Sequence, residues 1–150
     1  AVPQAPITEN EIAGDVKSVA ALTHAYAEAT SPKITVITGC AVGAGFVAMA
    51  GRASGADSVV AWPCSVIGTL NAETAVELLY KDRLAAGEDR KKLEAEYEQD
   101  VCSPFKAAAA GFIDDIIEPN ETALKLASLL EMLSGKRVNT LAKKHSNMPL

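Results

Sequence analysis

The sequence has 150 residues, of which 49% are hydrophobic and 22% are charged. This length and composition are typical of one soluble globular domain and argue against a disordered or low-complexity chain. The formal net charge is −5, and the body of the chain has no run of Lys and Arg interleaved with aromatic residues. The charge balance therefore argues against a nucleic-acid partner.

The first half of the chain predicts one helix followed by short strands. An apolar stripe at helical spacing starts near Asp15, and Ser31-Pro32 marks the end of this helix. Residues 34–38 are all β-branched, which predicts a buried strand. The segments that follow are a glycine-rich loop at 39–45, a short helix at 46–53, and strands at 58–61 and 66–68.

The middle of the chain predicts two helices with different surroundings. Asn71 is placed to cap a helix that ends near Lys81. The residues expected to face inward are Val76, Leu79 and Tyr80. Residues 87–100 are mostly charged and have one narrow apolar edge, so a surface helix is expected there. That edge consists of Leu93, Tyr97 and Val101.

The last third predicts a short helix, a strand and a longer helix. Ser103-Pro104 opens the short helix, and residues 112–117 predict the strand. Asn120 is placed to cap the final helix, and Gly135 lies where a left-handed residue commonly ends one. The predicted apolar face of that helix comprises Ala123, Leu126, Leu130 and Leu133, with Leu129 beside it. Strands that alternate with helices indicate an α/β core.

The cysteines and the longest uncharged stretch bear on localisation. Cys40, Cys64 and Cys102 form no CxxC pair and have no histidine at ligand spacing. They predict neither a disulfide framework nor a metal site, and a reducing cytoplasm is expected. Residues 34–51 carry no charge, but their β-branched residues and repeated glycines indicate a buried strand, turn and helix and no membrane insertion.

The loop at 39–45 is the segment that best suits chemistry. A strand that breaks at glycines and enters a helix leaves the first N–H groups of the helix unpaired. Two such adjacent amides, held rigidly, can stabilise an oxyanion. The alternative is that the glycines only permit close packing of helix on sheet.

A dinucleotide-binding site is a poor fit to the same loop. Gly43, Gly45 and Ala48 satisfy a relaxed form of that fingerprint. However, four residues separate the strand end from Gly43, and the next strand runs into Trp62-Pro63 where an acid is needed.

Five segments match one known family in order and approximate spacing. They are YAEATSPKITVI at 26–37, GADSVVAWP at 55–63, AVELLY at 75–80, GFIDDIIEP at 111–119 and KKHSNMPL at 143–150. The chain resembles the carboxyltransferase (beta) subunits of biotin-dependent acyl-CoA carboxylases, such as propionyl-CoA and acetyl-CoA carboxylase. The resemblance covers the C-terminal, biotin-side domain, so residues 1–150 are expected to form this domain and to lack the CoA-binding N-terminal half.

The resemblance implies a fold, a reaction and partners. The implied fold is α/β, a single-domain crotonase-like (ClpP/crotonase) spiral of ββα units. The implied reaction transfers a carboxyl group between carboxybiotin, carried by a biotin carboxyl carrier protein, and an acyl-CoA bound by the CoA-side domain. No metal and no tightly bound cofactor are expected. A homo-oligomer is implied, and the chain alone is expected to be inactive.

The resemblance also assigns roles to residues of the loop. The family's biotin-side amides lie in a Gly-Gly-Ala-Tyr run, which is collinear with residues 43–46. The catalytic amides, which stabilise the ureido oxyanion of biotin, are therefore assigned to Ala44 and Gly45. Contacts with biotin are assigned to Gly43, Phe46 and Val47.

The chain departs from the family at three positions. Val47 stands where propionyl-CoA enzymes often have an acid, so the acyl group stays open. Ala110 replaces a common arginine, and Asn71 replaces a glycine. The sequence indicates neither the direction of transfer nor the origin of the CoA-side half.

Two other functions stay open at this point. One is a stand-alone crotonase-type acyl-CoA hydratase or isomerase, which would need an acid and a base over the loop. The other is a non-catalytic oligomerisation module, for which the small-residue and Leu-rich helices would supply the packing surfaces.

Overall fold

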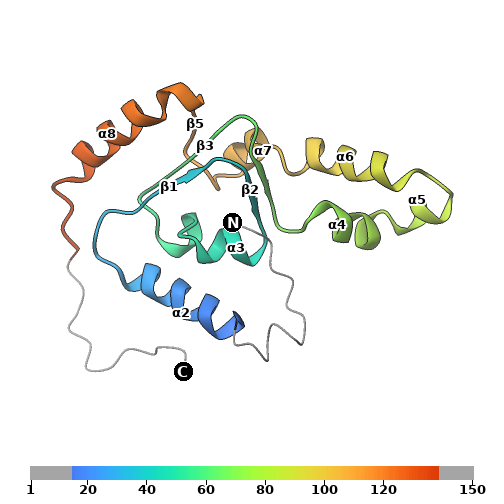
Figure 1. The fold of residues 1–150 in the computed structure, drawn as a ribbon, viewed down its shortest axis with the longest axis horizontal. Coiled ribbons are helices and arrows are strands. Elements are labelled where there is room, and N and C mark those ends of the chain that lie inside the picture. The colour runs from blue at the N-terminus through green and yellow to red at the C-terminus, as the bar shows by residue number, and fades with distance from the viewer. Residues whose placement is uncertain (1–14, 139–150) are drawn as a thin grey trace.

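Short parallel strands form two small sheets at the centre of the molecule (Figure 1). The computed structural model describes residues 15–138. One sheet has the order β1-β3-β5 and consists of β1 (Ile34–Ile37), β3 (Ser58–Ala61) and β5 (Asp115–Ile116). The other pairs β2 (Cys40–Val42) with β4 (Val66–Gly68).

The pairing of β1 with β3 forms the centre of the core. Ile34 lies opposite Ser58, and Ile37 lies opposite Ala61. Val59 is fully buried, as are the two residues that follow it. The middle strand of a parallel sheet is covered on both faces, so it is apolar throughout and does not alternate. The predicted strands at 34–38 and 58–61 are confirmed, the first of them one residue shorter.

Helices cover the sheets from two sides. They are α2 (Asp15–Glu28), α3 (Ala44–Ala48), α7 (Pro104–Ala109) and α8 (Thr122–Leu133), with the 3-10 turns η1 (Arg52–Ser54) and η2 (Pro119–Glu121). Figure 1 shows α2 and α3 side by side below the strands and α8 above them. Leu129 of α8 belongs to the same buried cluster as Val60 and Ile117, so α8 is anchored on β3.

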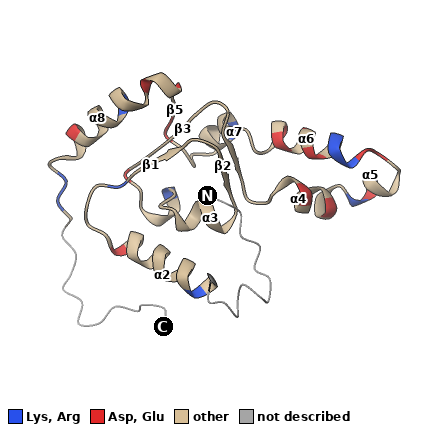
Figure 2. Ribbon diagram, viewed as in Figure 1, with Lys and Arg blue, Asp and Glu red and all other residues tan. Residues whose placement is uncertain are grey.

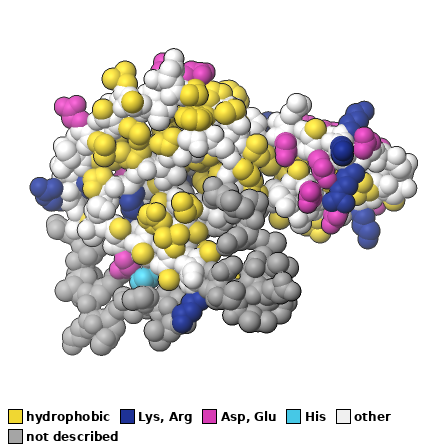
Figure 3. All heavy atoms as spheres, viewed as in Figure 1, with side chains coloured by type: hydrophobic (Ala, Val, Ile, Leu, Met, Phe, Trp, Pro, Cys, Tyr) yellow, Lys and Arg dark blue, Asp and Glu magenta, His cyan; other side chains and the backbone are white. Residues whose placement is uncertain are grey.

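A helical arm, residues 72–100, projects from this body (Figure 1). It consists of α4 (Ala72–Leu79), α5 (Lys81–Ala85) and α6 (Arg90–Asp100). The arm has a core of its own, because Val76 and Leu93 are fully buried and Tyr97 is 2% exposed. Figure 2 shows charged residues gathered on the arm, and Figure 3 shows their side chains on its surface, whereas the described part of the body is largely apolar or uncharged on the visible face.

Ion pairs of Arg83 join the segments of the arm. Its guanidinium lies 2.8 Å from Glu88 and 2.8 Å from Glu96, and 5.3 Å from the centroid of the Tyr80 ring. The hydrogen bonds from Arg83 hold the pKa of both glutamates below the usual range. All these groups are partly exposed, so they fix geometry more than they add stability.

None of the helices in residues 15–138 combines the length and the apolar character that crossing a bilayer requires.

The glycine-rich segment contains a strand that the sequence did not indicate. Residues Cys40–Val42 form β2, and Val42 lies opposite Gly68 of β4. The prediction of an irregular loop there is wrong because the flanking glycines at 39 and 43 hide a strand of three residues. The following helix starts at Ala44, not at residue 46, and ends at Ala48.

Two predicted signals at the ends of α8 are wrong. Asn120 lies inside η2, and α8 begins after Glu121 without a side-chain cap. The 3-10 turn that starts at Pro119 removes the extended geometry that a capping residue needs. Gly135 is not left-handed, and Ser134 ends the helix in the right-handed region. Leu129 is the residue of α8 that is buried, whereas Leu130 is 56% exposed.

Other predictions hold only in part. The strand expected at 112–117 is limited to Asp115–Ile116, although Ile113 and Ile117 are buried as expected. Leu79 is 59% exposed and does not face inward, whereas Val76 does. The arm bends at α5, a helix that was not predicted. The family-like segment at 143–150 lies outside the described residues.

Candidate functional site

Gly43 connects β2 to α3 in a conformation that suits glycine. Its φ is 62° and its ψ is −140°, in a region where a side chain would be strained. Its N–H donates to the carbonyl oxygen of Gly68 at 3.0 Å. A Cβ at position 43 would lie 3.4 Å from the carbonyl oxygen of Thr69. The turn into α3 is therefore held against the end of β4.

The two amides that follow Gly43 have no hydrogen-bond partner in the described part of the chain. No acceptor for the N–H of Ala44 or Gly45 lies at hydrogen-bonding distance among residues 15–138, whereas the N–H of Phe46 donates to the carbonyl oxygen of Gly43 at 3.2 Å. This is the expected state of the first amides of a helix. Two N–H donors are thus available to an acceptor from outside this part of the chain.

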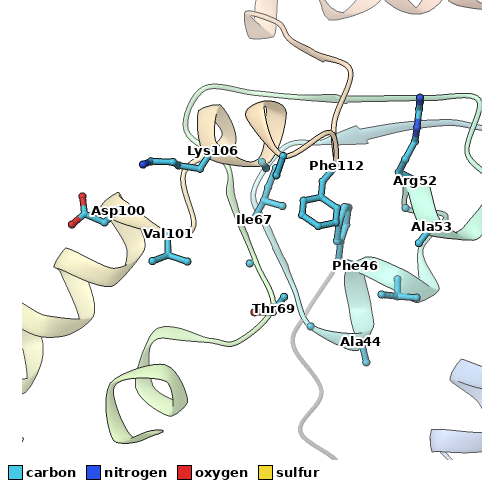
Figure 4. A pocket seen from close by; sticks show the side chains of 16 residues that line it. Ala44, Phe46, Arg52, Ala53, Ile67, Thr69, Asp100, Val101, Lys106 and Phe112 are labelled. Carbon is cyan, nitrogen blue, oxygen red and sulfur yellow. The ribbon is translucent and has the colours of Figure 1, made fainter. Parts of the chain in front are cut away.

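A pocket of about 640 Å³ lies next to these amides (Figure 4). Its walls come from α3 and η1, from β4, from the end of the arm, and from α7 with the loop after it. The lining residues are Gly43, Ala44, Phe46, Val47, Gly51, Arg52, Ala53, Ile67, Gly68, Thr69, Asp100, Val101, Lys106, Ala107, Ala110 and Phe112. Most of them are apolar, and the volume is within the range of small-molecule sites, about 300–1,000 Å³.

The structure brings together four of the five site residues that were predicted. Gly43, Ala44, Phe46 and Val47 all line the pocket, and Gly45 does not. Val47 is 45% exposed, so its side chain lies at the rim. The sequence placed these residues in one loop, and the structure adds the cavity beside it.

The charged residues of the pocket lie on opposite sides of it. Figure 4 shows Lys106 and Asp100 on one side and Arg52 on the other, with the Arg52 side chain directed away from Phe46. Arg52 is held by Asp114, with 2.7 Å between the guanidinium and a carboxylate oxygen. Lys106 forms no ion pair within residues 15–138.

Several lining residues could not be found from the sequence. Thr69 and Ala107 carry no motif. They reach the pocket because Phe46 of α3 packs against a buried cluster that includes Ile67 of β4 and Ala107 of α7. Ala110 also lines the pocket, and it was singled out as a departure from the family. Phe112, in the same wall, belongs to the family-like segment at 111–119.

The described residues offer no cluster suited to a metal. No group of three or more His, Cys, Asp or Glu side chains in residues 15–138 is arranged to hold an ion. His24 is half-buried on α2 and is not among the residues that line the pocket.

Comparison with known proteins gives consistent matches. The carboxyl transferase domain family matches residues 5–148. A propionyl-CoA carboxylase carboxyltransferase subunit of Haloferax mediterranei is 42% identical over 149 residues, which are 97% of this chain and 29% of the relative. The methylmalonyl-CoA carboxyltransferase 12S subunit of Propionibacterium freudenreichii subsp. shermanii is 40% identical over 148 residues, 96% of this chain and 28% of the relative.

Solved structures agree with the sequence matches. Transcarboxylase 12S, whose structure was described as a hexamer assembly with methylmalonyl-coenzyme A and methylmalonic acid bound, superposes with a TM-score of 0.87. It is 39% identical and covers 97% of this chain and 29% of its own. The β subunit of geranyl-CoA carboxylase from P. aeruginosa has a TM-score of 0.72, is 25% identical and covers 97% of this chain and 29% of its own.

The expected crotonase-like α/β fold is confirmed by these structural matches. The chain spans less than a third of the length of the relatives that it matches. The expected resemblance to the carboxyltransferase subunits of biotin-dependent acyl-CoA carboxylases such as propionyl-CoA carboxylase is also confirmed. The similarity to a methylmalonyl-CoA carboxyltransferase was not expected from the sequence. With residues 5–148 matched, this chain belongs to the carboxyl transferase domain family.

Proposed function

We propose that this chain forms the biotin-side half of an acyl-CoA carboxyltransferase. The observation that carries the proposal is a pair of adjacent amides, Ala44 and Gly45, that have no acceptor among residues 15–138. Ala44 lines an apolar pocket, in a member of the carboxyl transferase domain family. Carboxybiotin supplies the carboxyl group, and its ureido oxygen gains negative charge as the bond from nitrogen to the carboxyl carbon breaks. Amides that donate to this oxygen lower the barrier to that step.

The donor set fits a biotin ring. The ureido group is neutral and offers one carbonyl oxygen, which suits N–H donors and needs no charged partner. Gly43 lets the backbone approach a ligand closely, and Phe46 and Val47 offer apolar surface beside it. The proposal therefore gives the amides of Ala44 and Gly45 the oxyanion role and gives Gly43, Phe46 and Val47 the contacts with the ring.

The rest of the reaction needs parts that lie outside this chain. The relatives are more than three times as long in sequence, since the match covers 28–29% of them. We propose that a CoA-side half binds the acyl-CoA, that a biotin carboxyl carrier protein delivers carboxybiotin in the cytoplasm, and that the working enzyme is a homo-oligomer. Support comes from transcarboxylase 12S, which was described as a hexamer in a multienzyme core. The chain by itself is expected to be inactive.

The other candidate functions receive less support. A hydratase or isomerase requires an acid and a base over the loop, and among the described lining residues Asp100 is the one acid. A non-catalytic oligomerisation module would use apolar surface, and α8 does expose Leu124 and Met132. That surface does not account for the pocket or the unpaired amides.

Reconstitution tests the proposal directly. The chain is mixed with free carboxybiotin and an acyl-CoA, with and without a separately expressed CoA-side half from a relative, and transfer of labelled carboxyl is followed. Turnover is expected only when both halves are present. Turnover by the chain alone would contradict the half-site proposal, and a complex of both halves without any turnover would favour the oligomerisation module.

A further inference from the structure

The position of the glycine turn depends on the last residue of β4. Gly43 donates its N–H to the carbonyl oxygen of Gly68 at 3.0 Å, and the residue before it, Val42, lies opposite Gly68 in the sheet. Ala44 and Gly45 follow directly after Gly43. A displacement of Gly68 therefore moves the turn and the two unpaired amides with it.

Gly68 in turn lies against a buried sulfur atom. A Cβ at position 68 would lie 2.6 Å from Sγ of Cys102, a distance that two such atoms do not adopt. The next nearest atoms, the carbonyl oxygen of Leu70 and Cβ of Cys102, would lie at ordinary distances of 3.5 Å and 3.6 Å. The sulfur of Cys102 thus occupies the space that a side chain at position 68 would need.

The sulfur is itself held in place from several sides. Cys102 is 1% exposed, and its carbonyl oxygen accepts the N–H of Ile67, the neighbour of Gly68, at 2.8 Å. Its side chain belongs to one buried cluster with Ala75 and Tyr97, from the core of the arm. Burial raises the pKa of Cys102, so the thiol stays neutral near pH 7. Cys102 is therefore a buried, uncharged side chain with a fixed position, packed against Gly68 of β4.

We propose that Cys102 is a positioning residue for the catalytic loop. Its sulfur sets the position of Gly68, Gly68 holds Gly43, and Gly43 fixes the position of the amides of Ala44 and Gly45 beside the pocket. The consequence for turnover rests on the function proposed above, whereas the consequence for the position of the amides does not. Positions 68 and 102 are expected to be coupled in packing, and we call them the packing unit. A methyl group added at position 68 fits only if the sulfur atom at position 102 is removed.

A reciprocal substitution tests the packing unit. Gly68→Ala, Cys102→Ala and the double variant are made in the 150-residue chain, and the backbone amide signals of Gly43, Ala44 and Gly45 are followed by NMR with hydrogen exchange. Gly68→Ala should shift these signals and speed exchange at Gly43 at least about tenfold, since its hydrogen bond is displaced. The double variant should return toward the wild type, because only ordinary contacts then surround the new Cβ.

Turnover with the CoA-side half gives a second readout. Gly68→Ala is expected to lose about a hundredfold in kcat, because misplacement by an ångström at a reacting centre has effects of this size. The double variant should recover most of that loss. Gly135→Ala serves as the control, since a Cβ there would meet nothing within 4 Å, and it should leave both readouts unchanged.

The outcomes separate this inference from the proposed function. A loop spectrum unchanged in Gly68→Ala, or a double variant no closer to the wild type than Gly68→Ala, would overturn the positioning role. If Gly68→Ala does not fold, Cys102→Ala is compared with the double variant instead. The loop signals of the double variant must then lie closer to the wild type than those of Cys102→Ala. Signals that lie no closer would overturn the positioning role. If the NMR pattern is as expected but the wild-type chain shows no turnover with the CoA-side half, the proposed function is overturned and the positioning role remains supported.

Discussion

The hydroxyl of Thr35, in β1, donates to the carbonyl oxygen of Ala50 at 2.7 Å. Within residues 15–138, Ala50 is the one residue other than glycine with a positive φ, 56°. It is 5% exposed and lies two residues beyond the end of α3, the helix that carries Phe46 and Val47. The sheet therefore holds the exit of the helix that forms one wall of the pocket, in a backbone conformation that would otherwise be unfavourable.

Thr35→Val should weaken this exit. The change keeps the shape of the side chain but removes the donor, which leaves a buried carbonyl without its partner. The free energy of unfolding should fall by about 1–2 kcal/mol, measured by urea denaturation. Thr35→Ser keeps the hydroxyl and serves as the control. Equal stability of the two variants would show that the bond to Ala50 does not hold the turn.

Ala44→Pro tests the oxyanion role of one amide. Ala44 is the first residue of α3, a position that tolerates proline because its N–H has no acceptor within the helix. The variant should fold, as checked by circular dichroism, and turnover with the CoA-side half should fall at least about a hundredfold. Ala44→Gly retains the N–H and should keep most of the activity. Unchanged turnover in folded Ala44→Pro would place the oxyanion donor elsewhere.

Asn71 and Asn120 make a matched pair for helix capping. The side chain of Asn71 accepts the N–H of Thr74 at 2.9 Å and caps α4, whereas Asn120 lies within η2 and caps nothing in the described part of the chain. Asn71→Ala should lower the free energy of unfolding by about 1 kcal/mol. Asn120→Ala should have an effect within about 0.5 kcal/mol. Urea denaturation of both variants checks the contrast, and equal losses would contradict it.

The carboxylate of Asp57 should make the stability depend on pH. It accepts the N–H of Lys33 at 2.7 Å and the ammonium of Lys136 at 2.7 Å. Burial alone would raise the pKa of Asp57, but the hydrogen bonds from Lys136 and Lys33 outweigh it and hold the pKa below the usual range. Such a group stabilises the fold above its unfolded pKa, near about 4, and loses this contribution as the pH falls through its folded value.

Lys136→Met should therefore destabilise the protein in a pH-dependent manner. At pH 7 the free energy of unfolding should fall by about 1 kcal/mol. The difference from the wild type should shrink as the pH falls below about 4 and vanish below the lowered folded pKa of Asp57, where the carboxyl group is protonated in both proteins. Arg137→Met removes the same charge from the neighbouring position and should show no such trend. A Lys136→Met effect of constant size from pH 7 to pH 3 would rule out Asp57 as its source.

Local patterns in the sequence were enough to find most elements and the loop of the site. The β-branched run of β1 and the strands β3 and β4 were predicted correctly, since burial of a parallel strand leaves a continuous apolar signal. The cap at Asn71 was also correct, because a capping side chain acts on an amide three residues away. The predictions for Asn120 and Gly135 were wrong, because the conformation of the neighbouring backbone overrides the preference of the residue type there.

The pocket could not be predicted in the same way. Its walls combine Gly43 with Thr69, Val101 and Phe112, which come from separate elements that meet only in the folded chain. Strand β2 was missed for a related reason, since three residues between glycines become a strand only when β4 pairs with them. Contacts of this kind depend on the packing of segments that are distant in the sequence, so a local sequence pattern does not predict them.

By itself, the sequence determined the family, the α/β class and the position of the glycine turn at Gly43, because these depend on order, periodicity and the conformational freedom of single residues. Tertiary structure alone decided that Ala44 faces a cavity and that Cys102 lies under Gly68. Both depend on how closely separate segments approach one another, and side-chain volumes fix that approach only when the whole core is packed.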